Sequence, residues 1–104
     1  MICVAVVYPN ETGMRFDLEY YRDRHLPLVK DCYGPYGLSR IELDEAVSKS
    51  GKNAAPYIAI AHMMFPSMDD FIKAYREAGE QVMADIPSFT DIDPVIQISQ
   101  RVTI

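Results

Sequence analysis

The chain lacks the sequence patterns by which nucleotide-dependent and serine-dependent enzymes are recognised. Its 104 residues include only five glycines and contain no GxGxxG, GxxxxGKS/T or GxSxG pattern. The first two patterns cradle the phosphates of dinucleotides and nucleotides, and the third exposes a nucleophilic serine. The sequence therefore gives no support for nucleotide, dinucleotide or acyl-serine chemistry.

Positive charge is also scarce. Lysine and arginine number ten against fifteen acidic residues, which gives a net charge of −5. The one close basic grouping, Arg15, Arg22, Arg24 and Lys30, is interleaved with acidic residues, as is typical of a solvated face. Because an acidic surface repels phosphate backbones, nucleic acid is not an expected partner.

Two cysteines, Cys3 and Cys32, both lie in apolar stretches. The apolar opening at residues 2–8 has no positively charged flank and is too short for a signal peptide or a membrane span. We therefore expect reduced packing thiols, a cytoplasmic location and no membrane partner. The length predicts a single domain over residues 1–104.

The order of predicted elements is strand, helix, strand, repeated once. Strands are predicted at 2–8, 38–46, 56–65 and 93–102, and residues 47–55 are predicted to form a hairpin connection. One helical pattern follows an N-cap at Asp17 and is expected to kink near His25 because of Pro27. The other follows an N-cap at Ser67 and runs to about residue 85. The pattern predicts an α+β fold, a ferredoxin-like βαββαβ unit with a four-stranded antiparallel sheet and both helices on one face.

The first and third predicted strands are apolar on both of their faces, yet helices would cover only one face of the sheet. The uncovered face is expected to carry Cys3, Ala5, Val7, Ala59, Ala61, Met63 and Phe65. A second copy of the same sheet would cover it, so we expect a homodimer. The alternative is a monomer in which the small residues of this face are tolerated.

Residues 16–29, Phe-Asp-Leu-Glu-Tyr-Tyr-Arg-Asp-Arg-His-Leu-Pro-Leu-Val, resemble the signature of the EthD family. That signature has a Phe, an aromatic pair and then His-x-Pro-Leu. Residues 89–94, Phe-Thr-Asp-Ile-Asp-Pro, are similar to the last loop and strand of the family. The second aromatic of the pair is often Trp in the family and is Tyr21 here.

This resemblance covers essentially the whole chain and implies a dimeric α+β barrel, in which two four-stranded sheets face each other and the helices lie outside. Related barrel families include polyketide cyclases, muconolactone isomerases and cofactor-free monooxygenases, whose substrates bind between the sheet and the helices. The family name implies a fold but no particular reaction.

The candidate catalytic residue is His25. It follows Tyr21 by four residues, so both are expected on one apolar helical stripe that faces the sheet. An imidazole there could act as general acid or base on an aromatic or enolisable substrate. The alternative is a structural His that bonds a backbone carbonyl and packs the helix kink.

The second histidine, His62, lies on the alternation of Ile58, Ile60 and Met64 and would converge on the same cleft if that face meets the helices. Otherwise it is an ordinary buried or edge histidine. Two histidines without a third ligand at metal spacing predict no metal or haem site, and no cofactor is expected.

Tyrosines are the expected binding residues. Tyr8 ends the first strand and Tyr33 ends the first helix, so both are expected to rim a cleft and, with Tyr21, to bind a planar organic molecule. Asp91 and Asp93 could close its mouth.

Three functional hypotheses remain open from the sequence. The first is a cofactor-free enzyme that acts on a hydrophobic, aromatic or polyketide-like small molecule, with His25 as acid or base. The second is a non-catalytic accessory protein of a degradation pathway that binds such a metabolite. The third is a cleft filled by side chains, with the dimer as the functional surface.

Overall fold

The computed structural model describes all 104 residues. Strand β1 (Ile2–Pro9) is followed by a helical segment made of α1 (Leu18–Tyr20), the π-helical turn η1 (Tyr21–His25) and α2 (Leu26–Tyr33). Strands β2 (Arg40–Glu45) and β3 (Tyr57–Phe65), helix α3 (Met68–Asp85) and strand β4 (Val95–Gln100) complete the order. The 3₁₀ turns η2 (Gly34–Tyr36) and η3 (Ile86–Ser88) end the two helical segments. The last strand is shorter than the predicted 93–102.

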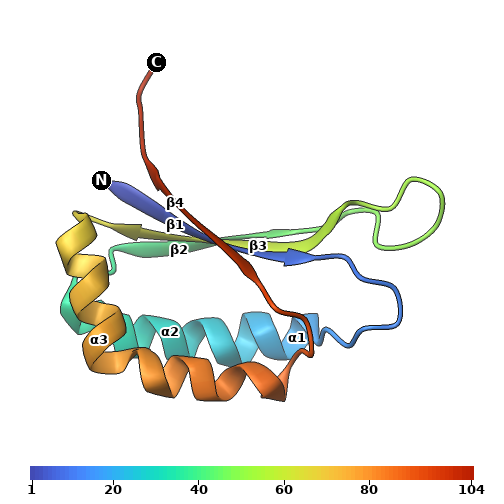
Figure 1. Cartoon of the computed structure of the whole chain (residues 1–104), viewed down its shortest axis with the longest axis horizontal. Coiled ribbons are helices and arrows are strands. Elements are labelled where there is room, and N and C mark those ends of the chain that lie inside the picture. The colour runs from blue at the N-terminus through green and yellow to red at the C-terminus, as the bar shows by residue number, and fades with distance from the viewer.

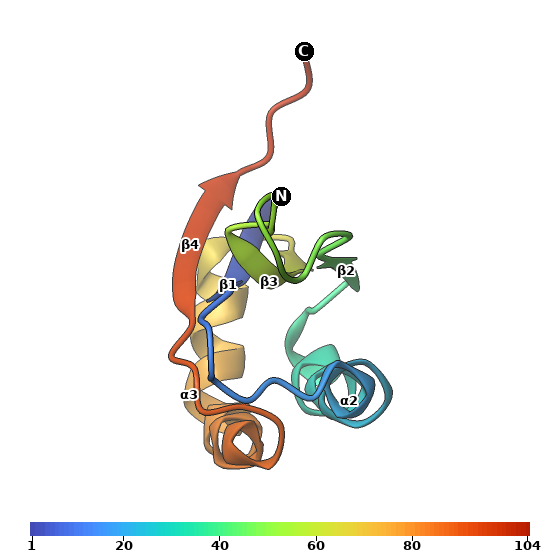
Figure 2. The same cartoon turned by 90° about the vertical axis from the view of Figure 1, so that its right-hand side faces the viewer.

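The strands form one antiparallel sheet in the order β2-β3-β1-β4 (Figure 1). Helices α2 and α3 both lie on one face of this sheet, and no helix lies on the other (Figure 2). The predicted α+β, ferredoxin-like fold is therefore confirmed. Strands β1 and β3 occupy the two central positions, which explains why their sequences are apolar throughout.

The pairing register shows which residues face the helices. Val4 pairs with Met63, and both belong to the buried core between sheet and helices, whereas Cys3 pairs with Met64 on the opposite face. Residues opposite each other in a ladder share a face. The expectation was therefore right for β1 and wrong for β3: the residues Ala59, Ala61, Met63 and Phe65 point to the helices.

We call the helix-free side the open face. It carries Cys3, Ala5 and Val7 from β1 and Ile60, His62 and Met64 from β3. A strand that is apolar on both sides has no alternation in its sequence, so its phase relative to β1 is set only by the cross-strand register. That is why the sequence pattern assigned the wrong set of alternate β3 residues to this face.

The first helical segment is irregular at the predicted position. Asp17 caps it by accepting a hydrogen bond from the Tyr20 amide at 3.0 Å. The amide of Leu26 then bonds the carbonyl of Tyr21, five residues back, which widens the turn just before Pro27. Because Pro27 has no amide donor and its ring would crowd the carbonyl four residues earlier, a wide turn accommodates it there. The expected kink near His25 is this π turn.

Helix α3 begins as predicted. The Ser67 hydroxyl accepts a hydrogen bond from the Asp70 amide at 3.2 Å and donates one to the Asp70 carboxylate at 2.9 Å. Both cysteines are free, with Cys3 buried and Cys32 half-buried. Neither long helical segment has the length and apolar character needed to cross a membrane.

Candidate functional site

A cavity of about 420 Å³ lies between the helix-covered face of the sheet and the two helices. Eighteen residues line it, and fifteen of these are hydrophobic. The volume is in the usual range for sites that hold small organic ligands. Because His25 lies in the wall of this open cavity, the hypothesis that side chains fill the cleft is excluded.

The cavity opens between α3 and β4. Among its hydrophobic lining residues, Tyr75, Met83 and Ile96 are the exposed ones, at 52%, 49% and 50% respectively. Asp93 lies with them in the lining, as expected for a residue at the mouth. Asp91 has a different role, since its carboxylate pairs with Arg15 at 3.3 Å and it does not line the cavity.

His25 is paired with a carboxylate from the far end of the chain. Its Nδ1 lies 3.0 Å from Oδ2 of Asp85, and the Tyr20 hydroxyl donates to Oδ1 of the same carboxylate at 2.7 Å. The His25 side chain is 5% exposed and that of Asp85 is 18% exposed. No protein group forms a hydrogen bond with Nε2 of His25. Every fully buried side-chain nitrogen or oxygen in the molecule has a partner, so Nε2 is not one of these buried atoms and is accessible from the cavity.

Burial lowers the pKa of His25, and the hydrogen bond and charge of Asp85 oppose this shift without cancelling it. For Asp85, burial would raise the pKa, but the hydrogen bonds from His25 and Tyr20 outweigh it, and the pKa is lowered. Near neutral pH the pair is therefore a neutral imidazole beside a carboxylate. An ionised carboxylate can only accept, so Nδ1 carries the proton and Nε2 presents a lone pair to the cavity.

Aromatic rings hold the imidazole in place. The ring of Tyr21 stacks on that of His25 with centroids 5.6 Å apart and an interplanar angle of 17°. The ring of Phe89 lies 4.6 Å from His25 and 4.8 Å from Tyr21. The expected stripe of Tyr21 and His25 is therefore present. The imidazole of His25 forms its hydrogen bond with the Asp85 carboxylate and not with a backbone carbonyl.

The three predicted tyrosines all line the cavity. Tyr8, Tyr21 and Tyr33 are 1%, 1% and 2% exposed, so they lie within its walls and not at a rim. Their hydroxyls have no protein partner and are accessible from the cavity. Burial raises the pKa of Tyr8 and Tyr21, and raises that of Tyr33 to about 12, so all three remain hydrogen-bond donors at neutral pH.

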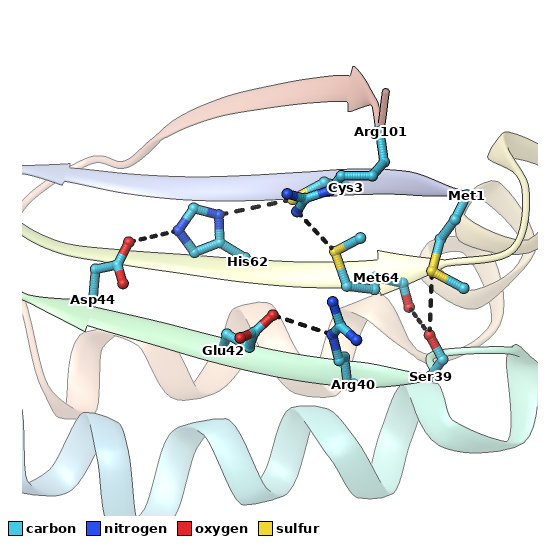
Figure 3. A network of polar contacts seen from close by, with 9 residues as sticks. All are labelled: Met1, Cys3, Ser39, Arg40, Glu42, Asp44, His62, Met64 and Arg101. Carbon is cyan, nitrogen blue, oxygen red and sulfur yellow. Dashed lines mark hydrogen bonds and ion pairs between the residues drawn. The ribbon is translucent and has the colours of Figure 1, made fainter. Parts of the chain in front are cut away.

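His62 does not join this group. It lies on the open face, where Nε2 is 2.8 Å from Oδ2 of Asp44 and Nδ1 is 3.8 Å from Sγ of Cys3 (Figure 3). The expected convergence of His62 with His25 is not found, because the register turns His62 away from the helices. Figure 3 also shows Glu42 paired with Arg40 on the same face, at 3.1 Å.

Sequence reasoning missed Asp85, Tyr20 and Phe89 as parts of the site. The signal for Asp85 was its place as the last residue of α3, where the helix dipole disfavours a carboxylate. An acidic residue at such a position calls for a compensating donor, but nothing local identifies His25, which is sixty residues away. No group of three metal-ligating side chains gathers in this chain.

The fold and the cavity define a small α+β protein with a ligand-sized apolar site and a buried histidine–aspartate pair. The family model described as the EthD domain matches residues 14–93. The chain therefore belongs to the EthD family. A search of curated proteins returned no match.

Solved structures agree with this assignment. An EthD-like protein from Ralstonia eutropha JMP134 is 36% identical over 98% of this chain and 92% of that one, with a TM-score of 0.88. An EthD family protein from Bacillus halodurans C-125 is 18% identical over 98% and 99%, with a TM-score of 0.75. A protein from Arabidopsis thaliana is 10% identical over 100% and 98%, with a TM-score of 0.71. The last two likenesses show the fold alone.

Proposed function

We propose that this chain is a small-molecule enzyme of the EthD type, which acts without a cofactor on a hydrophobic, aromatic or polyketide-like metabolite. One observation carries the proposal: His25 presents an unpaired Nε2 to an apolar cavity while Asp85 holds its Nδ1 at 3.0 Å. A general base needs a free lone pair at the substrate and a pKa near the working pH. The lowered pKa of His25 keeps that lone pair available at neutral pH.

Asp85 acts in this proposal as a positioning residue. Its carboxylate selects the tautomer of His25 and stabilises the imidazolium that forms when Nε2 accepts a proton. The Tyr20 hydroxyl, at 2.7 Å, fixes the orientation of that carboxylate. The three elements α1, η1 and α3 thus hold one proton-accepting atom against the cavity.

Tyr8, Tyr21 and Tyr33 are the proposed substrate-binding residues, because each contributes a ring and a free hydroxyl to the wall. His62 is left out of the substrate site, since it lies on the open face. We propose that this face instead meets a second copy in a dimeric α+β barrel. The apolar residues Cys3, Ala5 and Val7, at the centre of a helix-free sheet, support that pairing.

A non-catalytic accessory protein that binds a hydrophobic metabolite is the second candidate. The observation that favours it is the lining itself, in which fifteen of eighteen residues are hydrophobic. Such a cavity retains an apolar ligand by burial alone.

The experiment starts from protein purified from its own host, with native mass spectrometry to identify a co-purified small molecule. That molecule is then incubated with the wild type and with His25→Gln, and His62→Gln serves as the control from the open face. We expect about a hundredfold lower turnover for His25→Gln and an unchanged rate for His62→Gln. Ligand binding without turnover by the wild type would instead establish the accessory protein.

A further inference from the structure

The polar groups of the cavity identify the chemical class of ligand that it accepts. We infer that the site takes an uncharged compound with a carbonyl or phenolic oxygen, and that the hydroxyls of Tyr8 and Tyr21 donate hydrogen bonds to this oxygen. This inference rests on the proposed function and assigns two of its binding residues a specific role.

The charge of the lining excludes anionic ligands. No lysine or arginine is among the eighteen lining residues. The carboxylates nearby are Asp93 at the mouth and Asp85 behind His25. A buried carboxylate or phosphate would lose its hydration and find no cation to compensate it. The ligand therefore enters in an uncharged form.

The hydroxyls of Tyr8 and Tyr21 are hydrogen-bond donors in the cavity wall that have no protein acceptor. Tyr8 comes from β1 and Tyr21 from η1, with ring centroids 5.6 Å apart at an interplanar angle of 78°. Both residues are 1% exposed as a whole, but their hydroxyls have no protein partner and are accessible from the cavity. Burial keeps both protonated by raising the pKa, and the Tyr8 hydroxyl adds to the rise at Tyr21. Since both hydroxyls are accessible from the cavity and belong to neighbouring rings, a ligand oxygen bound beside them gains these hydrogen bonds.

The same arrangement supports a balanced proton transfer. Nε2 of His25 takes a proton from a carbon next to the carbonyl, and the electron pair of that C–H bond forms a carbon–carbon double bond. The carbonyl π pair moves to the oxygen, where the two tyrosine hydroxyls stabilise the enolate. The imidazolium beside Asp85 then returns the proton to a carbon of the enolate, and the electron pair on oxygen re-forms the carbonyl, so the carbon–carbon double bond is consumed and no group leaves. For a phenol, His25 takes the hydroxyl proton and the same donors hold the phenolate.

The test compares three probes of the same ring system by calorimetric titration of the full-length protein at pH 8. Naphthalene has no oxygen, 2-acetylnaphthalene has a carbonyl, and 2-naphthoate is anionic. We expect the ketone to bind about threefold to tenfold more tightly than naphthalene, from the added hydrogen bonds. The naphthoate should bind more weakly than both.

The variants Tyr8→Phe and Tyr21→Phe remove one hydroxyl each and keep the ring. Each should weaken the ketone about threefold or more and leave naphthalene unchanged, whereas Tyr57→Phe, an exposed residue outside the lining, should change neither. Equal binding of ketone and naphthalene, or a ketone affinity unaffected by both variants, would overturn this inference. The role of His25 would stand separately, because turnover measures it. Failure of all three probes to bind would overturn the inference together with the proposed ligand site.

Discussion

The molecule contains two histidine–aspartate pairs on opposite faces of one sheet. The nitrogen–oxygen distances are similar, 3.0 Å for His25 and Asp85 and 2.8 Å for His62 and Asp44. Their exposures differ: the side chains of His25 and Asp85 are 5% and 18% exposed, whereas those of His62 and Asp44 are 28% and 69% exposed. Water screens the electrostatic interaction between His62 and Asp44, whereas the interaction between His25 and Asp85 is largely shielded from water. Distance alone therefore does not distinguish the buried pair from the exposed one.

The two pairs also differ in how the chain builds them. His62 and Asp44 come from neighbouring strands: His62 lies opposite Glu42, and Asp44 lies two residue pairs further along the same ladder. His25 and Asp85 come from two different helical segments and meet only when both pack on the sheet. The buried pair is therefore a product of tertiary packing, and changes in that packing should affect it first.

The largest expected effect is on stability, from Phe89→Ala. Phe89 is fully buried and its ring contacts those of Tyr8, Tyr21 and His25. Its loss should lower the free energy of unfolding by about 3–5 kcal/mol, measured by urea denaturation. Val7→Ala on the open face is the control, with a much smaller cost in a monomer. A loss below about 1 kcal/mol for Phe89→Ala would show that the aromatic packing does not hold the buried pair.

Next in size is the effect of Asp85→Asn on turnover. The amide no longer selects the tautomer of His25 or stabilises its imidazolium, so kcat/KM should fall on the order of tenfold to hundredfold. Asp44→Asn is the matched change in the other pair and should leave kcat/KM unaltered. The pH profile adds a second readout: since Asp85 raises the pKa of His25, its removal should move the acidic limb of kcat/KM to lower pH. An unmoved limb would contradict the positioning role.

A smaller effect is expected in the pH dependence of unfolding. The folded-state pKa of His25 lies below its ordinary value of 6.5, so the unfolded chain binds the proton more readily. The free energy of unfolding should therefore be highest above pH 6.5, decline as the pH falls through 6.5 and level off below the folded-state pKa. Denaturant titrations of the wild type and His25→Gln between pH 5 and 8 test this. A decline of equal size in the variant would assign it to other groups.

The smallest effect is expected from Asp44→Asn on stability. An exposed polar contact of this kind contributes less than about 1 kcal/mol, so the free energy of unfolding of the monomer should change by no more than that. Repeating the measurement over a range of protein concentrations sharpens the comparison. A larger loss at high concentration would show that a partner molecule covers this pair, whereas a concentration-independent loss above 1 kcal/mol would contradict the solvent-screened description.

Local chemistry explains which features could be predicted from the sequence. The caps at Asp17 and Ser67 bond amides three residues away, and the irregularity before Pro27 follows from its own missing donor, so short windows were sufficient. The phase of β3 and the partner of His25 depend on register and packing between distant segments. Cys3 lies opposite Met64, and Asp85 lies beside His25. Each contact joins residues about sixty positions apart, so no short stretch of sequence could predict it.

The π turn before Pro27 holds one residue more than an α-helical turn would need. Each residue of a regular helix rotates the next by about 100°. Deleting a single residue from Tyr21–His25 would allow a regular α-helix to form, but all side chains on one side of the deletion would then be rotated about the helix axis. Either His25 or the α2 side chains that pack on the sheet would lose their place. The additional residue thus keeps Tyr21 and His25 on the same cavity-facing side of the segment as Val29 and Tyr33.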